Sequence, residues 1–514
     1  MAYALLIDLV LRAREAGGGS SAAGLRLLGA HGIELDEKGR RRSSFRVALP
    51  ELPTEGDVVS FPDEAALLSD LAGRLARSDT LVTLQGRQVD LPVLESLALR
   101  HRVPLPGEFS AEDPYRARRS PYNLAGHLDL LSFLADGDRR MRWLDPGLVL
   151  PALLPGAFGV PARDLERDDL VAARRRALAT YLLYLRVQRL RGLLSGEDVR
   201  ARLAELSGAG LPAELRPWTE TPAWAGEPYV PPATRLANGE SSAAGLLAFD
   251  IETVPDEVAL GRALGRRLSP AEVPAVLAEV LGGEGDFAPA PFHRVVAVSM
   301  VRWERDREVE LERLVLGGAS GAGAPTPTEA DLLAAFWQAA RGRRLASYNG
   351  RRFDLPVLLW RSLPHPIELP FYLAERGAPR ERYRHPHSVR QLDVFERLAG
   401  GLSPGPLGDL LEAVGLPGKL GPDGGDVARL WAEGEAETVG DYCLQDAAQT
   451  LLLALRFLEI AGELSPASVR KATGSAYRRF SREPALAPVL EGGVAFLDRE
   501  EVDLARNTGR EGGR

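Results

Sequence analysis

The chain has 514 residues, of which 45% are apolar and 26% are charged, and its formal net charge is −8. These values are typical of a globular protein with several domains. The single cysteine, Cys443, excludes an intrachain disulfide or a thiolate zinc site and suggests a reducing, cytoplasmic location. We expect neither a membrane span nor a secretory signal, because prolines interrupt the uncharged stretch Gly147 to Ala162 and the N-terminus lacks a basic leader.

The first half of the chain contains a segment that recurs later. An apolar run from Leu5 to Val10 predicts a first strand. Further on, Leu81-Val-Thr-Leu-Gln-Gly-Arg-Gln-Val-Asp-Leu-Pro-Val-Leu94 is similar to Leu345-Ala-Ser-Tyr-Asn-Gly-Arg-Arg-Phe-Asp-Leu-Pro-Val-Leu358. Three shorter pairs keep the same order, namely 64–68 with 329–333, 127–130 with 391–394, and 180–186 with 450–456. We therefore predict two tandem copies of one domain, residues 1–206 and residues 246–470.

The segment 207–245 between the copies has the composition of a linker, with six prolines and the sequence Asn238-Gly-Glu-Ser-Ser242. Its aromatic residues Trp218, Trp224 and Tyr229 predict a strap that lies on a surface. Residues 471–514 form a predicted C-terminal tail, and its stretch Ala485 to Phe496 is a candidate for docking on the domain.

In the second copy, strands come first and then alternate with helices. Predicted strands cover 246–252, 294–302, 308–315 and 344–348, and predicted helices cover 329–341, a segment starting near Phe353, 392–399, 406–414, 426–433 and 437–461. This order predicts an α/β layer fold.

Acidic residues in three of these elements form a candidate metal site. Asp250 and Glu252 are two residues apart on a strand and share one face of it. Asp354 begins a helix, while Tyr442 and Asp446 are four residues apart on the last helix and also share a face. Four converging carboxylates could hold two divalent cations, Mg²⁺ or Mn²⁺, which suit phosphodiester hydrolysis. A tyrosine stays protonated at neutral pH, so Tyr442 is suited to orienting water or a phosphate oxygen.

These signatures resemble the DEDD 3′–5′ exonuclease superfamily, and Tyr442-x-x-x-Asp446 resembles its tyrosine subtype, DEDDy. Phe249-Asp-Ile-Glu-Thr-Val-Pro-Asp256, Phe292-His-Arg-Val-Val-Ala-Val-Ser299 and Leu416-Pro-Gly-Lys419 resemble the stand-alone bacterial group related to the exonuclease domain of B-family DNA polymerases. The resemblance covers about 245–465. It implies a ribonuclease-H-like mixed sheet flanked by helices, with Asp250, Glu252, Asp354 and Asp446 as metal ligands and Tyr442 as the residue that positions water.

Neighbours of the carboxylates are candidate substrate contacts. Asn349 could bond near the scissile end or only form a turn, and Phe353 could wedge against the terminal base or belong to the core. Candidate contacts to the substrate also include Thr253, Arg351, Arg352 and Lys419, although solvated charge is the alternative for each of the three cations.

The first copy lacks most of these groups. Asp8 and Asp90 align with Asp250 and Asp354, but Val10, Ala172 and Arg176 stand where Glu252, Tyr442 and Asp446 are expected. We predict that this copy is catalytically inactive and that it packs against the active copy or adds nucleic-acid-binding surface.

The predicted function is a cytoplasmic, metal-dependent exonuclease that acts on 3′ ends of single-stranded nucleic acid, with DNA favoured. The 3′–5′ polarity comes from the resemblance. Two alternatives remain open, an RNA-trimming exoribonuclease and a non-catalytic nucleic-acid-binding scaffold. DNA and RNA differ at the 2′-hydroxyl, and no residue pattern in the sequence shows which one is bound.

Overall fold

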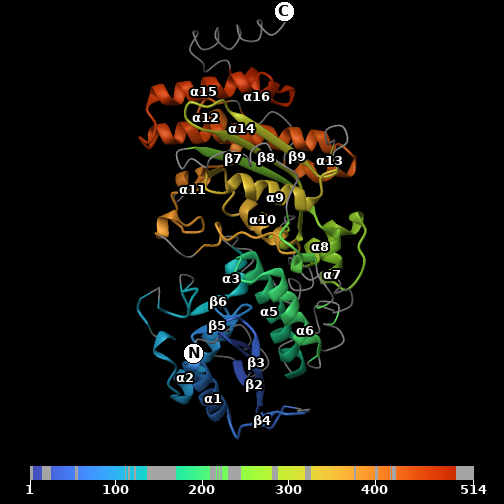
Figure 1. The fold of residues 1–514 in the computed structure, drawn as a ribbon, viewed down its shortest axis with the longest axis vertical. Coiled ribbons are helices and arrows are strands. Elements are labelled where there is room, and N and C mark those ends of the chain that lie inside the picture. Colours follow the sequence, from blue (N-terminus) through green and yellow to red (C-terminus); the bar gives the residue numbers. More distant parts are fainter. Residues whose placement is uncertain are drawn as a thin grey trace, which may run out of the picture. The chain divides into compact units, whose positions relative to one another are not determined.

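The structure is a computed structural model of the whole chain. It describes residues 4–13, 25–52, 56–109, 111–113, 116–120, 123–135, 170–208, 216, 219, 223–229, 245–280, 288–318, 326–374, 378–399, 403–416, 418 and 424–493. Within these residues, none of the helices has the length and apolar character required to span a bilayer. Contacts divide the chain into two compact units, and Figure 1 labels elements of each. Unit 1 comprises Met1–Pro228 and Glu257–Phe292, and unit 2 comprises Tyr229–Asp256 and His293–Arg514.

Unit 1 is built on a sheet with the strand order β4-β3-β2-β1-β5-β6. Strands β1, β2 and β3 pair antiparallel, whereas β5 and β6 add parallel to β1. Its elements are β1 (Ala4–Ala13), β2 (Leu25–Leu35), β3 (Arg41–Ala48), β4 (Val59–Ser60), α1 (Glu64–Arg77), β5 (Thr80–Thr83), α2 (Asp90–His101), β6 (His127–Asp129), α3 (Leu130–Ala135), α5 (Leu170–Leu190), α6 (Gly196–Gly208), α7 (Glu257–Ala263) and α8 (Val273–Val280).

Unit 2 has a sheet with the order β11-β10-β7-β8-β9. Figure 1 shows this sheet between α14, which has α15 on its far side, and a layer containing α9 and α10. Its elements are β7 (Leu246–Pro255), β8 (His293–Trp303), β9 (Glu310–Val315), α9 (Glu329–Ala340), β10 (Arg344–Ser347), α10 (Asp354–Ser362), β11 (Gln391–Asp393), α11 (Val394–Leu398), α12 (Leu407–Ala413), α13 (Val427–Ala432), α14 (Ala436–Ile460), α15 (Pro466–Phe480) and α16 (Ala487–Gly493).

The two units repeat one design, so the predicted fold class of two α/β copies with mixed sheets is confirmed. Strands β3-β2-β1-β5-β6 correspond to β9-β8-β7-β10-β11 in order and in direction. Each central strand carries an irregularity at the equivalent place, between Val10 and Leu11 in β1 and between Glu252 and Thr253 in β7. Such bulges bend a strand and re-aim its side chains.

Local details of the repeat agree as well. The loop that leads into α2 contains Gly86, and the loop that leads into α10 contains Gly350. A Cβ atom at Gly86 would clash with Thr83, and one at Gly350 would clash with Ser347. The residues before the two helices, Val89 and Phe353, have nearly the same backbone angles. The sequence similarity between 81–94 and 345–358 therefore reflects one local structure formed twice.

The core of unit 2 extends beyond the predicted end of the domain at residue 470. Buried residues of α15 and α16 join the same apolar cluster as the inner face of α14: Val469, Ala472, Ala476, Tyr477, Phe480 and Val489. Ser465 caps α15 by accepting a hydrogen bond from the N–H of Ser468. Residues 471–493, assigned to the tail from the sequence, thus contribute helices to this core. The domain boundaries themselves stay a prediction.

Two other regions differ from expectation or refine it. Residues 391–393 form the edge strand β11, so the predicted helix over 392–399 was wrong at its start.

In the linker, Trp224 is buried under the guanidinium of Arg186 within unit 1. Tyr229 donates to the carbonyl of Pro366 through its N–H and to Asp331 through its hydroxyl within unit 2. Trp218 lies outside the described residues.

Candidate active site

Strand β7 places two carboxylates on one face at the centre of the sheet of unit 2. Leu246 to Phe249 are buried, and the strand then continues through Asp250, Ile251 and Glu252. Glu252 is 8% exposed although it is charged. The bulge directly after Glu252 interrupts the regular pairing with β8, which resumes in a shifted register from Thr253 and Val295 onward. A buried apolar strand thus presents acidic groups at the position where its regular ladder is interrupted.

Helix α14 packs on β7 and brings a third carboxylate to this face. The thiol of Cys443 donates to the backbone carbonyl of Asp250, with 3.3 Å between sulfur and oxygen. Burial raises the pKa of this thiol, and the charges of Asp250 and Glu252 raise it further. Cys443 is therefore a protonated packing residue, and its neighbours Tyr442 and Asp446 face the carboxylates of β7.

Three carboxylates converge. One oxygen each from Asp250, Glu252 and Asp446 lies within 4.8 Å of the others. Oxygen ligands at this density fit a hard divalent cation, because like charges held so close repel one another unless a cation or protons neutralise them.

Asp354 lies outside that group of three but close to it. Burial raises the pKa of Asp354 to about 7, and the charges of Asp393 and Asp446 raise it too, while the N–H groups of Ile251 and of Asp354 itself oppose this shift. Asp354 is 7% exposed and begins α10, the helix that the sequence predicted from about this position. Asp354 thus lies near enough to the acidic group for the charge of Asp446 to act on it, and its role as the fourth ligand stays a prediction.

Tyr442 is hydrogen-bonded to the same group. Burial raises its pKa, as do the charges of Asp446, Glu252 and Asp250, and its hydroxyl donates to the carboxylate of Asp446. The phenol is therefore protonated at neutral pH and can donate a hydrogen bond but cannot act as a base. Its expected role in positioning water stays a prediction.

The loop before α10 is held by Asp393, which accepts hydrogen bonds from the N–H groups of Asn349 and Arg351 at 2.9 Å each. Asn349 has a φ of 64°, a left-handed conformation that asparagine adopts more readily than most residues. The equivalent Asp129 of unit 1 accepts from the N–H of Arg87 at 2.8 Å. Because both copies keep this bond, Asp393 and Asp129 shape the equivalent loops of the two units. Asn349 lies in a turn, and its contact with substrate stays a prediction.

The candidate phosphate contacts have partners of their own. Arg351 lies 3.4 Å from Glu396 and Arg352 lies 3.7 Å from it, in both cases from Nε to a carboxylate oxygen. Arg352 also lies over the ring of Phe395. Both side chains are partly exposed, and a role in substrate binding would require them to leave or share Glu396. Lys419 lies outside the described residues.

His293 is a neighbour of the site that the sequence reasoning missed. Its Nδ1 lies 2.8 Å from the hydroxyl of Thr253, and its ring meets the ring of Phe353 edge-on with 5.1 Å between centroids. Thr253 on β7 and Phe353 directly before α10, two of the candidates for substrate contact, are therefore joined through one buried histidine. The spacing of forty residues between Thr253 and His293 gave no signal of this contact.

Unit 1 has an ion pair where unit 2 has its acidic group. Arg176 of α5, which corresponds to Asp446, donates from Nε to a carboxylate oxygen of Asp8 at 2.8 Å, and Arg176 is 3% exposed. A fixed guanidinium thus neutralises the only acid that β1 retains at this face. Val10 and Ala172 are buried and carry no ligand atom.

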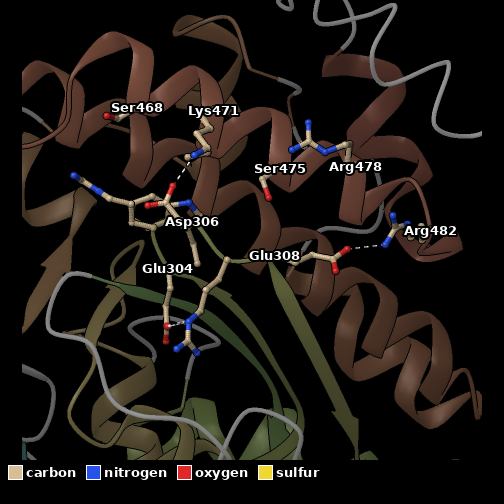
Figure 2. Close-up of a pocket in the computed structure, with 12 residues that line it drawn as sticks. Glu304, Asp306, Glu308, Ser468, Lys471, Ser475, Arg478 and Arg482 are labelled. Atoms are coloured by element: carbon tan, nitrogen blue, oxygen red, sulfur yellow. Dashed lines mark hydrogen bonds and ion pairs between the residues drawn. The ribbon is translucent and has the colours of Figure 1, made fainter.

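A cavity of about 690 Å³ lies elsewhere in unit 2, between the β8–β9 connection and α15. Figure 2 shows its lining side chains paired across it, Lys471 with Asp306 and Arg482 with Glu308, each at 2.6 Å. None of the four candidate metal ligands lines it, so its size does not make it the active site.

Comparison with known proteins supports the family assignment. No curated protein matches the chain. The model of the family described as "Predicted 3′-5′ exonuclease related to the exonuclease domain of PolB" matches residues 41–214 and 285–485, one segment in each half. These segments contain Asp354, Tyr442 and Asp446, whereas Asp250 and Glu252 precede the second one. Because the two matches together cover well over half of the sequence, the chain belongs to this family of predicted exonucleases related to the exonuclease domain of PolB.

Proposed function

We propose that unit 2 is a metal-dependent 3′–5′ exonuclease that removes nucleotides from the 3′ end of single-stranded nucleic acid. DNA is the favoured substrate because the family is related to the exonuclease domain of PolB. The observation that carries the proposal is the convergence of Asp250, Glu252 and Asp446, which come from two distant parts of the chain.

The donor set fits divalent cations of the Mg²⁺ or Mn²⁺ type. All its ligand atoms are carboxylate oxygens, and Asp354 adds a fourth acid whose pKa is raised first by burial and further by the charges of Asp393 and Asp446. We assign Asp250, Glu252, Asp354 and Asp446 to two such ions. When bound, these ions would activate water and stabilise the charge that develops on the phosphate.

The side chains of the site supply positioning. Tyr442 holds a proton on its oxygen and would donate it in a hydrogen bond to the attacking water or to a phosphate oxygen. The Thr253–His293–Phe353 contact forms a small surface beside the acids on which a terminal nucleotide could rest. The subtype implied by Tyr442 is DEDDy.

Unit 1 is proposed to be catalytically inactive. The ion pair between Asp8 and Arg176 occupies the position of the acidic group, and a buried cation there would repel divalent ions. Nuclease activity is accordingly assigned to unit 2 alone.

The direct test is digestion of 5′-labelled single-stranded DNA and RNA of one sequence by the full chain, with Mg²⁺, with Mn²⁺ and with EDTA. We expect a metal-dependent ladder that shortens from the 3′ end, release of mononucleotides, and protection by a blocked 3′ terminus but not by a blocked 5′ terminus. Faster digestion of RNA than of DNA would favour the exoribonuclease, and no shortening of either would contradict the proposal.

Asp446→Asn and Asp409→Asn form a matched pair of controls. Both remove one negative charge from a helix, but Asp446 belongs to the acidic group whereas Asp409 is exposed on α12. Activity must fall in the first variant and persist in the second. Equal activity in both would show that the observed digestion does not arise at this site.

A further inference from the structure

Unit 1 contains a small polar cavity on the face of its sheet that α5 covers. Its volume is about 70 Å³, and it lies between β2, β3, α5 and α6. The lining residues are His31, Ile33, Arg41, Ser44, Arg174, Leu178 and Leu206. Ser44 is exposed and Arg41 is partly exposed, so the cavity opens to solvent at β3, while His31 is buried at its inner end.

Positive charges converge on this cavity. Burial lowers the pKa of Arg174, and the charges of Arg46 and Arg41 lower it further. The pKa of His31 is lowered to about 3 by burial and then by the charges of Arg174, Arg46 and Arg41. Cations that depress one another's pKa values in this way would be stabilised by an anion placed among them.

Among the described residues, one that lines the cavity has a buried polar atom without a hydrogen-bond partner. Nδ1 of His31 makes no hydrogen bond to any residue within the described part of the chain, and His31 is 4% exposed. A buried polar atom without a partner costs free energy unless a water, an ion or a ligand bonds to it. This orphaned nitrogen is independent of the charge of the arginines and also indicates an occupant.

The fold does not require polarity here. The registers of the two sheets place Val301 and Leu311 where unit 1 has Ile33 and Ser44. The alignments of α5 with α14 and of α6 with α15 place Leu444, Ala448 and Ala476 where unit 1 has Arg174, Leu178 and Leu206. All five residues of unit 2 belong to its buried apolar cluster. His31 similarly takes the place of Ser299 opposite the aspartate of the central strand. Unit 1 therefore has a polar, cationic cavity where the same fold packs as a closed core.

We propose that this cavity, lined by His31, Arg41, Ser44 and Arg174, binds a phosphate-type oxyanion. The planar guanidinium groups suit two-pronged hydrogen bonding to phosphate oxygens, and the hydroxyl and imidazole can supply further hydrogen bonds. The cavity has room for a single tetrahedral anion. That anion is either inorganic phosphate or the phosphoryl group of a nucleoside monophosphate whose remaining parts lie outside the mouth.

The test is isothermal titration of the full chain in EDTA, with inorganic phosphate in one arm and a nucleoside 5′-monophosphate in the other. We expect saturable binding at one site in at least one arm. If both ligands bind and phosphate competes with the nucleotide, the two ligands share that site. Binding of phosphate alone would identify the free ion, and binding of the nucleotide alone would identify the phosphoryl ester. The absence of saturable binding in both arms would overturn the proposal.

Matched variants connect binding to this cavity. Arg174→Leu introduces the residue found at the equivalent place in unit 2 and should weaken binding at least tenfold, whereas Arg42→Leu removes an exposed charge beside Arg41 and should change it less than twofold. His31→Ser, which likewise introduces the residue of unit 2, provides a second test if Arg174→Leu unfolds, as judged by circular dichroism. Equal losses in the Arg174 and Arg42 variants would reveal unspecific charge attraction and contradict a built site.

Discussion

At the scale of single residues, Tyr442 allows the positioning of water to be tested apart from metal binding. Its hydroxyl donates to Asp446, but Tyr442 is not one of the carboxylates assigned to the metal ions. We predict that Tyr442→Phe lowers kcat by about 10²-fold, in the range of one lost catalytic hydrogen bond, with a much smaller change in KM. Steady-state kinetics on a single-stranded oligonucleotide would measure both parameters.

The metal dependence of the same variant provides its control. Because the carboxylates remain, the Mg²⁺ concentration that gives half-maximal activity should stay within about threefold of the parent's. A large increase in that concentration would mean that Tyr442 supports the metal site, and the assignment to positioning would then be wrong.

The acidic group also predicts a stability effect that does not depend on activity. Asp250, Glu252 and Asp446 repel one another when no cation neutralises them. We predict that Mg²⁺ or Mn²⁺ raises the Tm of unit 2. The Asp446→Asn variant should lose most of this gain, and its Tm without metal should be higher than that of the metal-free parent because one repelling charge is gone. Thermal unfolding with and without EDTA measures both effects. A metal-dependent gain that survives in the variant would place the ions elsewhere.

The sequence predicted the carboxylates of the site better than its surroundings. Spacing alone places Asp250 with Glu252 on one strand face and Tyr442 with Asp446 on one helix face. This is possible because side chains repeat on one face every two residues in a strand and about every 3.6 residues in a helix. It could not show that Glu396 attracts Arg351 and Arg352, or that His293 links Thr253 to Phe353. Those contacts depend on tertiary packing between segments that no local periodicity relates.

At the scale of elements, β1 and α5 of unit 1 are joined by the pair of Asp8 and Arg176. Arg176→Met would leave a largely buried carboxylate without its cation, so we predict a loss of about 3–5 kcal/mol in the stability of unit 1. Hydrogen exchange of the β1 amides would measure it. The double variant Asp8→Leu with Arg176→Met should recover much of the loss, and nuclease activity should be unchanged in both if unit 1 is inactive. A loss of activity in the well-folded double variant would contradict that assignment.

Strands β5 and β6 of unit 1 are joined by a buried neutral histidine. Nδ1 of His127 donates to the carbonyl of Arg118 and Nε2 lies against the hydroxyl of Thr83, both at 2.8 Å. Burial, and then the charge of Arg87, lowers the pKa of His127 to about 3. An unfolded histidine binds its proton near pH 6.5, so the unfolded state takes up more protons below that pH and stability falls as the pH drops from about 6.5 towards 3.

We predict that this histidine contributes about 2 kcal/mol to the loss of stability between pH 7 and pH 5. His127→Gln carries the residue of the equivalent position in unit 2, Gln391, and should reduce the acid sensitivity of unit 1 by that amount. Hydrogen exchange of the β5 amides at the two pH values would measure it. The same pH dependence in parent and variant would contradict this origin.

Elements were predictable where they are long or strongly patterned. The predicted helix over 437–461 matches α14, and the strand over 344–348 matches β10, within one residue at each end. Strand β11 was missed because it has only three residues, too few for an alternating pattern. Residues 471–480 of helix α15 were assigned to a tail, although apolar residues of this helix join the same core cluster as those of α14.

At the scale of the whole molecule, the chain shows how one fold can keep its architecture while its two copies diverge at the site. Strand order, the central bulge and the glycine loop are retained in both units. What differs is the charge carried on that frame: carboxylates in unit 2, and in unit 1 an ion pair beside a cationic cavity. The duplication was visible in the sequence because retained packing residues preserve local similarity, whereas the chemistry of unit 1 depends on pairs that are distant in sequence.

The extent of unit 2 along the chain leads to the last prediction. Helices α15 and α16 cover the side of α14 opposite the sheet, and the amide of Gln445, next to Asp446, donates to the carbonyl of Ala485 at 2.8 Å. A chain that ends at residue 470 lacks the buried Tyr477, Phe480, Leu486 and Val489. Each such side chain contributes about 1.5–3 kcal/mol on burial, so their joint loss approaches the whole stability of an ordinary domain.

We therefore expect the chain ending at residue 470 to be insoluble or to unfold at a much lower Tm, and to lose nuclease activity because α14 carries Tyr442 and Asp446. The matched control ends at residue 493 and keeps every core residue named above. Thermal unfolding and the digestion assay on the two truncated chains distinguish the outcomes. A chain of 470 residues that kept the parent's Tm and activity would show that α14 holds the catalytic face against the sheet without its outer layer, and the contribution assigned to α15 and α16 would then be wrong.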